Sequence, residues 1–396
     1  MTRVMISCGE ASGDLYAGAL VAEIRRLEPG ADIFGFGGAR LREAGARLVG
    51  DYRGMSVTGL AEALRVLPRS WRMLRQLVAA AAAERPSVFV AIDFPDFNFR
   101  LASAIRRLGI PVVYYVSPQV WAWRSGRMAT MKRLASRVLV IFPFEERLYQ
   151  DAGVPVEFVG HPLVDLARAT ASRGALLTEL GLDPAAPTIA LLPGSRPNEL
   201  RAIVPGLAGA APLIASRVPR AQFVVARAPS LDASLFRPLA AGRSGNPPVR
   251  IVEDRTDDVL AAADVVVTAS GTATVQAALH ERPMVIVYRL SPLTYLLGKP
   301  FVRVDTYGMV NLVAGRRIVT ELIQDAFTPE AVAGETVRLL TDEARAAEMR
   351  AALREVRQRL GSPGASRRAA EAVLREARQA DTSTRGSVRP ARGTDA

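Results

Sequence analysis

Short apolar runs recur along the chain and alternate with longer segments whose apolar residues have a helical spacing. Each run is roughly five residues long and rich in β-branched side chains, which is typical of parallel strands buried on both faces. Because the runs alternate with helical segments such as Leu15–Leu27, the pattern predicts right-handed βαβ units and an α/β fold class. The runs form two groups: Val4–Ser7, Ile33–Phe36, Val88–Ile92, Val112–Val116 and Val138–Phe142, then Thr188–Leu192, Gln222–Ala226, Val249–Val252, Val265–Thr268 and Met284–Tyr288.

The stretch between the two groups, residues 165–187, differs from both. It contains a helix-like piece followed by Gly181, Pro184 and Pro187, so we place a domain boundary near residue 167. The prediction is two Rossmann-like domains, residues 1–166 and 167–342, each with a doubly wound parallel sheet. Two such sheets facing each other would bind ligands in the cleft, at the carboxyl ends of their strands. Residues 381–396 are polar and without periodicity, which predicts a disordered basic tail.

Composition excludes several classes of protein. A single cysteine, Cys8, allows no intrachain disulfide and favours an intracellular protein. The two histidines, His161 and His280, are far apart in sequence, so neither a zinc site nor any other metal or cofactor is indicated. His161 fits either a ligand contact or a structural role. The uncharged stretches are too short or too proline-rich to span a membrane, and Glu10 and Asp14 interrupt the first apolar run, so we expect a cytoplasmic protein without a signal peptide.

The chain carries a formal net charge of +12, and nearly all of its positive charge is arginine. Such an excess attracts anions, namely nucleic acid, an acidic membrane surface or a phosphorylated substrate. A genome that favours arginine codons explains the excess equally well, so the net charge alone does not identify a partner.

One basic segment, residues 64–78, has an apolar stripe at helical spacing and no acidic residue. A basic amphipathic helix with a tryptophan suits an anionic membrane surface. A helix packed on its own sheet, with a solvated arginine face, would have the same pattern. The candidate membrane contacts are Leu67, Arg69, Trp71, Arg72 and Leu74.

The first candidate site is the glycine-bearing turn directly after the first strand. Such a turn lets main-chain N–H groups approach a ligand, and the helix N-terminus that follows favours an anion. Capping of that helix by Ser12 or Asp14 would explain the same residues. The candidates on this acceptor side are Gly9, Glu10, Ser12, Gly13 and Asp14.

A second candidate, Asp93, lies where the third apolar run leaves the sheet. A carboxylate among apolar neighbours at a strand end is well placed to have a raised pKa and to act as a general base. Asp96 either caps the next helix or belongs, with Asn98, to the acceptor side. Trp121 and Trp123 follow the next strand and form either an apolar wall of an acceptor pocket or a packed aromatic core.

Two turns of small residues follow strands in the second half of the chain. In the first, Arg196 precedes a proline suited to a helix start, where its guanidinium can clamp a phosphate with two hydrogen bonds. In the second, Gln276 falls one turn into the next helix and can reach a ribose hydroxyl, although capping alone explains Ser270 and Thr272. Both turns offer main-chain N–H groups to an anion, which favours a diphosphate-bearing ligand. The candidate nucleotide-binding residues are Gly194, Ser195, Arg196, Ser270, Gly271, Thr272 and Gln276.

Nine motifs, in their order and spacing, resemble the lipid-A-disaccharide synthase family of bacterial glycosyltransferases. They extend from Arg3 to about residue 375 and read GEASGD, IDFPDFN, YYVSPQVWAW, PFEERLY, FVGHP, LLPGSR, ASGTAT, PMVIVYR and NLVAGRRIVTELIQ. The resemblance implies the GT-B architecture. It also implies that the helices of residues 343–380 return to the first domain, of the same chain or of a partner subunit in a homodimer.

The resemblance further implies a reaction and a location. An inverting transfer without a metal would join UDP-2,3-diacylglucosamine to 2,3-diacylglucosamine 1-phosphate (lipid X). The products would be the β-1,6-linked disaccharide 1-phosphate and UDP. The protein would work peripherally at the cytoplasmic face of the inner membrane of a Gram-negative bacterium.

The resemblance also carries roles onto single residues. Asp93 matches the proposed general base for the acceptor 6-hydroxyl, and Arg196 matches the arginine that binds the diphosphate. Asn311 matches an asparagine near the nucleotide, also expected in catalysis. Where the family usually has glutamate, proline and serine, this chain has Gln276, Val310 and Gln119. The change at Gln276 removes a charge-assisted hydrogen bond to the ribose.

Two other functions compete with this interpretation. A GT-B transferase or UDP-sugar 2-epimerase acting on a soluble sugar would share the two nucleotide turns, but the basic amphipathic segment argues for a lipid-linked acceptor. A non-enzymatic protein of membranes or nucleic acid would use the net charge. It would not explain why turns of small residues follow strands in both halves, so we expect no nucleic-acid partner.

Overall fold

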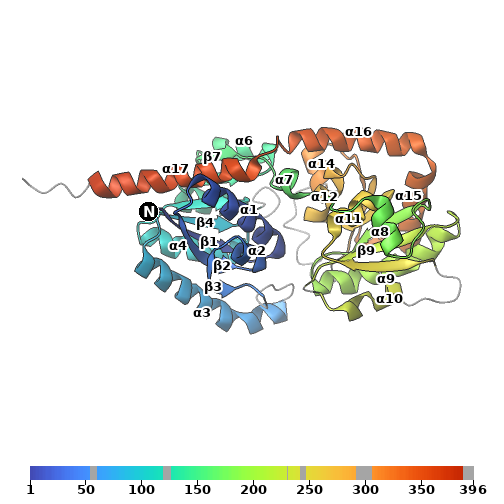
Figure 1. Ribbon diagram of the computed structural model, residues 1–396, viewed down its shortest axis with the longest axis horizontal. Coiled ribbons are helices and arrows are strands. Elements are labelled where there is room, and N and C mark those ends of the chain that lie inside the picture. Colours follow the sequence, from blue (N-terminus) through green and yellow to red (C-terminus); the bar gives the residue numbers. More distant parts are fainter. Residues whose placement is uncertain (54–59, 119–125, 230, 241–246, 291–305, 387–396) are drawn as a thin grey trace, which may run out of the picture. The chain divides into compact units, whose positions relative to one another are not determined.

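The computed structural model describes residues 1–53, 60–118, 126–229, 231–240, 247–290 and 306–386. The chain forms two compact units, the first from Met1–Pro162 together with the chain from Gly361 onward, and the second from Leu163–Leu360. Each unit is a parallel β-sheet with helices on both faces (Figure 1). The predicted α/β fold class is confirmed.

The first unit has a seven-stranded sheet in the order β3-β2-β1-β4-β5-β6-β7, and all neighbouring strands are parallel. The order reverses between β1 and β4, which is the switch point where open α/β sheets bind ligands. The strands are β1 (Arg3–Cys8), β2 (Asp32–Gly37), β3 (Arg47–Asp51), β4 (Val88–Ile92), β5 (Val112–Tyr115), β6 (Arg137–Val140) and β7 (Val156–Phe158). The helices are α1 (Ala11–Leu27), α2 (Ala39–Glu43), α3 (Leu60–Glu84), α4 (Pro95–Arg107), α5 (Gly126–Leu134), α6 (Pro143–Asp151) and α17 (Ala365–Gly386).

The second unit has a six-stranded sheet in the order β10-β9-β8-β11-β12-β13, again parallel throughout. Its switch point lies between β8 and β11. The strands are β8 (Thr188–Leu192), β9 (Gln222–Arg227), β10 (Val249–Glu253), β11 (Val265–Ala269), β12 (Met284–Tyr288) and β13 (Thr320–Ile323). The helices are α7 (Leu163–Leu166), α8 (Arg173–Glu179), α9 (Pro197–Ala215), η1 (Ala233–Phe236), α10 (Arg237–Ala240), α11 (Thr256–Ala262), α12 (Thr272–Leu279), α14 (Met309–Ala314), η3 (Gln324–Ala326), α15 (Pro329–Thr341) and α16 (Glu343–Arg359).

The central strands of both sheets are buried on both faces. Every residue of β4, β8 and β11 is buried, which is why these segments are continuous apolar runs rather than alternating ones. In the first unit the core around the sheet includes the fully buried Phe34, Phe36, Phe89 and Tyr114. Burial of a large apolar side chain contributes roughly 1.5–3 kcal/mol, so each of these rings stabilises the core by about that amount.

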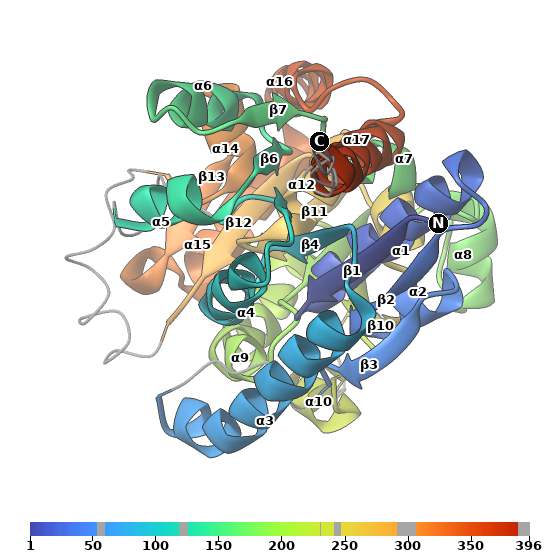
Figure 2. The same ribbon diagram turned by 90° about the vertical axis from the view of Figure 1, so that its left-hand side faces the viewer.

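The C-terminal helix α17 packs on the first unit although it follows the second unit in the sequence. It lies beside α1 and against β4 and β5 (Figure 2). Its inner face contains the fully buried Ala369, Ala370 and Val373, and small side chains let the helix approach the sheet closely. The guanidinium of Arg137 on β6 lies 2.7 Å from the carboxylate of Glu376 on α17, an ion pair that links the helix to the sheet.

The structure differs from the expected division of the chain at its C-terminal end. Both helices after residue 343 were expected on the first unit, but α16 belongs to the second, where it packs against α12, α14 and α15. The reason is its own apolar face, with Met349 and Leu353 buried there. Residues 381–386 were expected in a disordered tail but continue α17 to Gly386, because no glycine or proline interrupts the helix before that residue.

Candidate functional site

The glycine turn after β1 and the carboxylate after β4 meet at the switch point of the first sheet. β1 and β4 pair with Cys8 opposite Ile92, so Gly9 and Asp93 are the next residues of neighbouring strands. A Cβ added at Gly9 would overlap the ring of Phe94. Only a glycine, which has no Cβ, lets the turn after β1 lie this close to the ring of Phe94. The structure thus brings Gly9, an acceptor-side candidate, next to Asp93, the predicted general base.

The main chain at Asp93 has an uncommon conformation. Asp93 and Phe94 have φ angles of 44° and 48°, in the left-handed region that residues other than glycine rarely adopt. Two side chains donate hydrogen bonds to the main-chain oxygen of Asp93, namely Nδ2 of Asn98 at 2.8 Å and the hydroxyl of Tyr114 at 2.9 Å. Contacts from α4 and β5 therefore hold Asp93 in place.

Asn98, expected on the acceptor side, is fully buried beneath the turn. Besides Asp93, its Nδ2 lies within hydrogen-bonding distance of the main-chain oxygens of Ser7 (3.3 Å) and Ile92 (3.2 Å). Its Oδ1 accepts a hydrogen bond of 2.7 Å from the hydroxyl of Ser7. The side chain therefore joins the ends of β1 and β4 and acts on the candidate site through the position of Asp93.

Asp14, expected on the acceptor side, is a buried helix cap. Its carboxylate accepts hydrogen bonds from the main-chain N–H groups of Gly38 (2.7 Å), Arg40 (3.0 Å) and Leu41 (3.2 Å). These donors belong to the N-terminus of α2, so Asp14 caps a neighbouring helix rather than its own. Burial, followed by the nearby Asp14 carboxylate, raises the pKa of the Cys8 thiol well above its usual value.

The remaining acceptor-side candidates lie at two helix starts. Glu10 occupies the N-cap position of α1 with an extended backbone, and Ser12 and Gly13 follow in the first turn. Asp96, in the first turn of α4, is exposed and forms an ion pair of 2.9 Å with Arg127. Gln119, Trp121 and Trp123 lie outside the described residues.

His161 fits the structural alternative. Its side chain is buried, and its ring lies 5.9 Å from that of Tyr16 and 5.4 Å from that of Phe142. Burial lowers the pKa of His161 to about 3. The imidazole is therefore uncharged at neutral pH and packs as part of an aromatic cluster.

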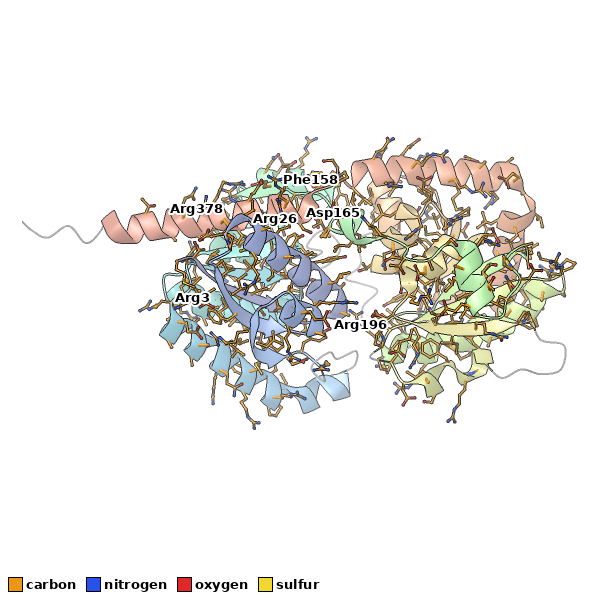
Figure 3. All side chains as sticks on the ribbon, in the orientation of Figure 1. Arg3, Arg26, Phe158, Asp165, Arg196 and Arg378 are labelled. Atoms are coloured by element: carbon orange, nitrogen blue, oxygen red, sulfur yellow. The ribbon has the colours of Figure 1, made fainter. Side chains whose placement is uncertain are left out.

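At the switch point of the second sheet, the turn after β8 is built around a glycine and a carboxylate. Gly194 has a φ of 121°, and a Cβ added there would lie 2.6 Å from Oε2 of Glu199. Glu199 accepts hydrogen bonds of 3.2 Å from the main-chain N–H of Ser195 and from Nη1 of Arg196. The side chain of Arg196, labelled in Figure 3, is 36% exposed. It is thus held at the start of α9 while remaining open to solvent, as a phosphate-binding arginine requires.

The second small-residue turn, after β11, is held from one side and open on the other. The hydroxyl of Ser270 donates a hydrogen bond of 2.9 Å to the main-chain oxygen of Tyr307. Gly271 has a φ of 149°, and no described atom lies within 4 Å of a Cβ added there. Thr272, which begins α12, is exposed. The side chain of Ser270 therefore anchors the turn, and the main chain around Gly271 leaves room for a ligand.

Asn311, expected to contact the nucleotide, is buried and fully engaged within the second unit. Its Nδ2 donates to the main-chain oxygen of Val319 (2.9 Å) and to Oε1 of Glu321 (2.7 Å). Its Oδ1 accepts from the main-chain N–H groups of Ile318 (2.8 Å) and Val319 (3.0 Å). An amide has two N–H donors and two lone pairs. The side-chain amide is therefore fully used within the second unit, where it holds α14 to the start of β13.

Gln276 lies one turn into α12, as its spacing predicts. Its Nε2 is 3.5 Å from Oδ1 of Asp257, which also makes a 2.9 Å hydrogen bond with Nε2 of His280. A separation of 3.5 Å is at the weak limit of a hydrogen bond. Gln276 is therefore only loosely tied to α11.

Helix α3 packs against the core in its second half and leaves large apolar side chains exposed in the turns before it. In its second half Leu77 is fully buried, and Leu74, a predicted membrane contact, is partly buried against the same core. In the preceding turns Leu67 is 38% and Trp71 49% exposed. The guanidinium of Arg100 on α4 lies over the Trp71 ring at 5.7 Å. Exposed arginines on this part of α3 are Arg69, Arg72 and Arg75.

Three residues of these sites are not predictable from the sequence pattern alone. Tyr114 lies in an apolar strand, where its hydroxyl gives no separate signal. Tyr288 ends β12 near Glu199 and Arg196, and burial, reinforced by Glu199, raises its pKa. Glu321 lies on β13, an edge strand without an apolar run. A glutamate between β-favouring residues was the signal that would have found it.

Two negative observations apply to the described part of the chain. Within it, no helix has the length and apolar character needed to cross a membrane. The same residues contain no group of three or more histidine, cysteine, aspartate or glutamate side chains arranged to hold a metal ion.

The chain is similar in sequence to proteins that share one name. The family model described as lipid-A-disaccharide synthetase matches residues 4–375. A lipid-A-disaccharide synthase of Anaeromyxobacter dehalogenans is 47% identical over 376 residues, which cover 94% of this chain and 97% of that protein. The Myxococcus xanthus enzyme of the same name is 45% identical over 372 residues, with the same coverage of both chains.

Solved structures with low sequence identity share the fold. A UDP-GlcNAc 2-epimerase from Neisseria meningitidis, bound to UDP-GlcNAc, has a TM-score of 0.67 at 12% identity, covering 94% of this chain and all of that one. The calicheamicin glycosyltransferase CalG4 has a TM-score of 0.60 at 17% identity, covering 96% and 99%. At these identities the likeness shows the two-unit GT-B fold alone.

Proposed function

This chain belongs to the lipid-A-disaccharide synthase family, and we propose how its residues divide the work of that glycosyltransferase. The reaction joins UDP-2,3-diacylglucosamine to 2,3-diacylglucosamine 1-phosphate. The acceptor 6-hydroxyl attacks C1 of the donor sugar, the bond from C1 to the UDP oxygen breaks, and the hydroxyl proton must go to a base. Two requirements follow: a proton acceptor for the hydroxyl and a cationic or N–H environment for the departing diphosphate.

Asp93 is the proposed base. It is the first residue after the central strand β4, beside the glycine turn at the switch point, and its main chain is held by Asn98 and Tyr114. A base must be kept within hydrogen-bonding reach of the hydroxyl that it deprotonates. Rigid support of the Asp93 backbone serves that purpose, because the rate of the reaction falls when the carboxylate is displaced from the hydroxyl.

Arg196 and the two helix starts of the second unit are the proposed diphosphate site. The side chain of Arg196 is held by Glu199 and open to solvent, and its guanidinium can make two hydrogen bonds to phosphate oxygens. The N-termini of α9 and α12 add main-chain N–H groups and the positive end of each helix dipole. Together they would offset the charge that develops on UDP as the bond to C1 breaks.

The observation that carries this proposal is the placement of the two groups. Asp93 and Arg196 each lie just beyond the central strands of their own sheet, at its switch point, within the family motifs IDFPDFN and LLPGSR. Gln276 lies one turn into α12, where we propose that its amide meets the ribose. The side chain of Asn311 is engaged by Ile318, Val319 and Glu321, and we propose that it stabilises this part of the second unit.

We further propose that α3 attaches the protein to the anionic surface where its lipid substrates reside, the cytoplasmic face of the inner membrane. Leu67 and Trp71 are among the large apolar side chains that remain exposed in the described chain, and arginines flank them. An amphipathic helix of this composition lies in the headgroup region with its apolar residues inserted. Attractions between arginines and anionic lipids add to that binding.

The test is product formation by the purified protein in detergent. Wild type, Asp93→Asn and the control Asp151→Asn, at an exposed carboxylate of the same unit, would receive UDP-2,3-diacylglucosamine and lipid X, with the disaccharide 1-phosphate and UDP followed by mass spectrometry. We expect the wild type and Asp151→Asn to make product and Asp93→Asn to lose about 10²–10⁴-fold in rate. Equal turnover by Asp93→Asn would reject the base, and a folded wild type that makes no disaccharide would reject the reaction.

A further inference from the structure

A carboxylate on the edge strand of the second sheet gathers three hydrogen bonds from one neighbouring segment. Oε2 of Glu321 accepts from the main-chain N–H of Tyr307 at 2.8 Å. Oε1 accepts from the main-chain N–H of Gly308 at 2.9 Å and from Nδ2 of Asn311 at 2.7 Å. Because the acceptor is a carboxylate, these bonds are charge-assisted and roughly twice as strong as neutral ones. Glu321 thus clamps residues 307–308 to β13.

The clamped segment is the one that holds the small-residue turn after β11. The main-chain oxygen of Tyr307 accepts the hydrogen bond from the hydroxyl of Ser270. The segment is also closely packed at Gly308, since a Cβ added there would overlap Cδ1 of Ile286 on β12 and approach Oε1 of Glu321 to 3.0 Å. A shift of the Glu321 carboxylate would therefore be transmitted through Tyr307 to Ser270.

We propose that Glu321 is a positioning residue for donor binding: through Tyr307 and Ser270 it fixes the main chain around Gly271, where the diphosphate of the nucleotide binds. This inference rests on the proposed function, which places the diphosphate at that turn. Glu321 itself touches neither the reacting atoms nor the nucleotide. Its contribution is a preorganised turn, which lowers the cost of ordering the binding site when the donor arrives.

Substitution by glutamine separates this role from simple packing. Glu321→Gln keeps the shape of the side chain and leaves one oxygen to serve Gly308 and Asn311. The new NH₂ group replaces Oε2, so it faces the N–H of Tyr307, and two donors cannot bond to each other. The link to Tyr307 is lost while the rest of the side chain stays in place.

The matched control is Glu335→Gln on α15. Glu335 is a buried carboxylate, whereas Glu321 is half-buried. Like Glu321 it contacts strand β13, by accepting a hydrogen bond of 2.8 Å from the hydroxyl of Thr320. Its other partners are Arg338 and Arg345. The control therefore removes a carboxylate that contacts β13 from α15 and leaves the hydrogen bonds between Glu321, Tyr307 and Ser270 in place.

Calorimetric titration with UDP and steady-state kinetics on the full-length protein test the proposal. For Glu321→Gln we expect the Kd for UDP and the KM for the donor to rise about tenfold, a change of about 1.4 kcal/mol, with the KM for lipid X unchanged. Glu335→Gln should lower the melting temperature and leave both donor constants at their wild-type values. Equal rises in both variants would reduce Glu321 to a structural residue and overturn the proposal.

Ser270→Ala keeps the proposal testable if Glu321→Gln does not fold, because it cuts the same path at its other end. Alone it should weaken UDP binding several-fold. Combined with Glu321→Gln it should weaken binding little further, because both substitutions break the same chain of hydrogen bonds and their effects are not additive. Unchanged UDP affinity in Ser270→Ala, or fully additive effects in the double variant, would contradict the path. A wild type that binds no UDP would instead reject the proposed function itself.

Discussion

The side-chain amide of Asn98 donates a hydrogen bond of 2.8 Å to the main-chain oxygen of Asp93. This bond joins a buried residue of α4 to the proposed base, whose φ of 44° is uncommon for a residue other than glycine. Such a conformation costs about 1–3 kcal/mol and persists only where surrounding contacts impose it. The amide of Asn98 and the hydroxyl of Tyr114 supply those contacts, so part of the stability of the fold maintains the geometry of the site.

Tyr114→Phe isolates one of the two contacts at little cost in packing. It removes the 2.9 Å hydrogen bond to the oxygen of Asp93 and leaves the ring in the core. We expect a loss of about 1 kcal/mol in the free energy of unfolding and a fall in kcat of about tenfold or more, because a displaced base loses rate steeply. The KM for the donor should not change. Urea unfolding and steady-state kinetics would measure these quantities.

Tyr149→Phe is the control for that prediction. Tyr149 is equally buried, and its hydroxyl lies 2.6 Å from that of Ser117 instead. The control should lose comparable stability and keep its kcat. If both tyrosine variants lost kcat to the same degree, the contact with Asp93 would have no special role.

Gly194→Ala tests the geometry of the turn that carries Arg196. The added methyl group would approach the carboxylate of Glu199 in a backbone region with a φ of 121°. We expect a loss of about 1–3 kcal/mol in stability and a Kd for UDP at least about tenfold higher, because Glu199 orients Arg196. The comparison is Gly181→Ala, where φ is 65° and the surroundings are open. That control should cost about 1 kcal/mol, with UDP affinity unchanged.

Vesicle binding tests the membrane role proposed for α3. The double variant Leu67→Ser, Trp71→Ser removes two exposed apolar side chains, so we expect its affinity for anionic phosphatidylglycerol vesicles to fall about tenfold or more. Binding of the wild type should weaken as salt rises, because salt screens the flanking arginines. Leu148→Ser is the matched control, since Leu148 on α6 is also 38% exposed. Equal losses in both variants, in a sedimentation assay, would remove α3 from the interface.

The sequence predicted the central strands well because burial on both faces leaves an unmistakable apolar run. Strands β3 and β13, at the edges of the two sheets, were missed because partly exposed strands mix polar and apolar residues. That omission matters at Glu321, whose place on β13 defines its contacts. A run of apolar residues indicates that a strand is buried, but it does not show which neighbouring segments its side chains will contact.

Among site residues, those fixed by strand ends were predictable and those fixed by tertiary hydrogen bonds were not. Asp93 and Arg196 follow central strands, so their placement at the switch points followed from the βαβ pattern. Asp14 and Asn311 have the same polar character in the sequence, yet their side chains are used inside the fold. Their donors come from Gly38 and Val319, and spacing gives no sign of such partners.

The buried histidine should make stability depend on pH below neutrality. The pKa of His161 is lowered by burial to about 3 in the folded protein, against about 6.5 when unfolded. Above 6.5 both states hold the imidazole uncharged, and as pH falls below 6.5 only the unfolded state gains the proton. Folding stability should therefore fall by up to about 1.4 kcal/mol per pH unit between about 6.5 and 3.

His161→Gln removes that dependence while keeping a polar side chain between Tyr16 and Phe142. Urea unfolding at pH 7 and pH 5 would compare the two proteins, because other titrating groups contribute to both and cancel in the difference. The wild type should lose about 2 kcal/mol more than the variant over this interval. An equal loss in the two proteins would mean that His161 takes up its proton in the folded state, and that the aromatic cluster around it opens to water.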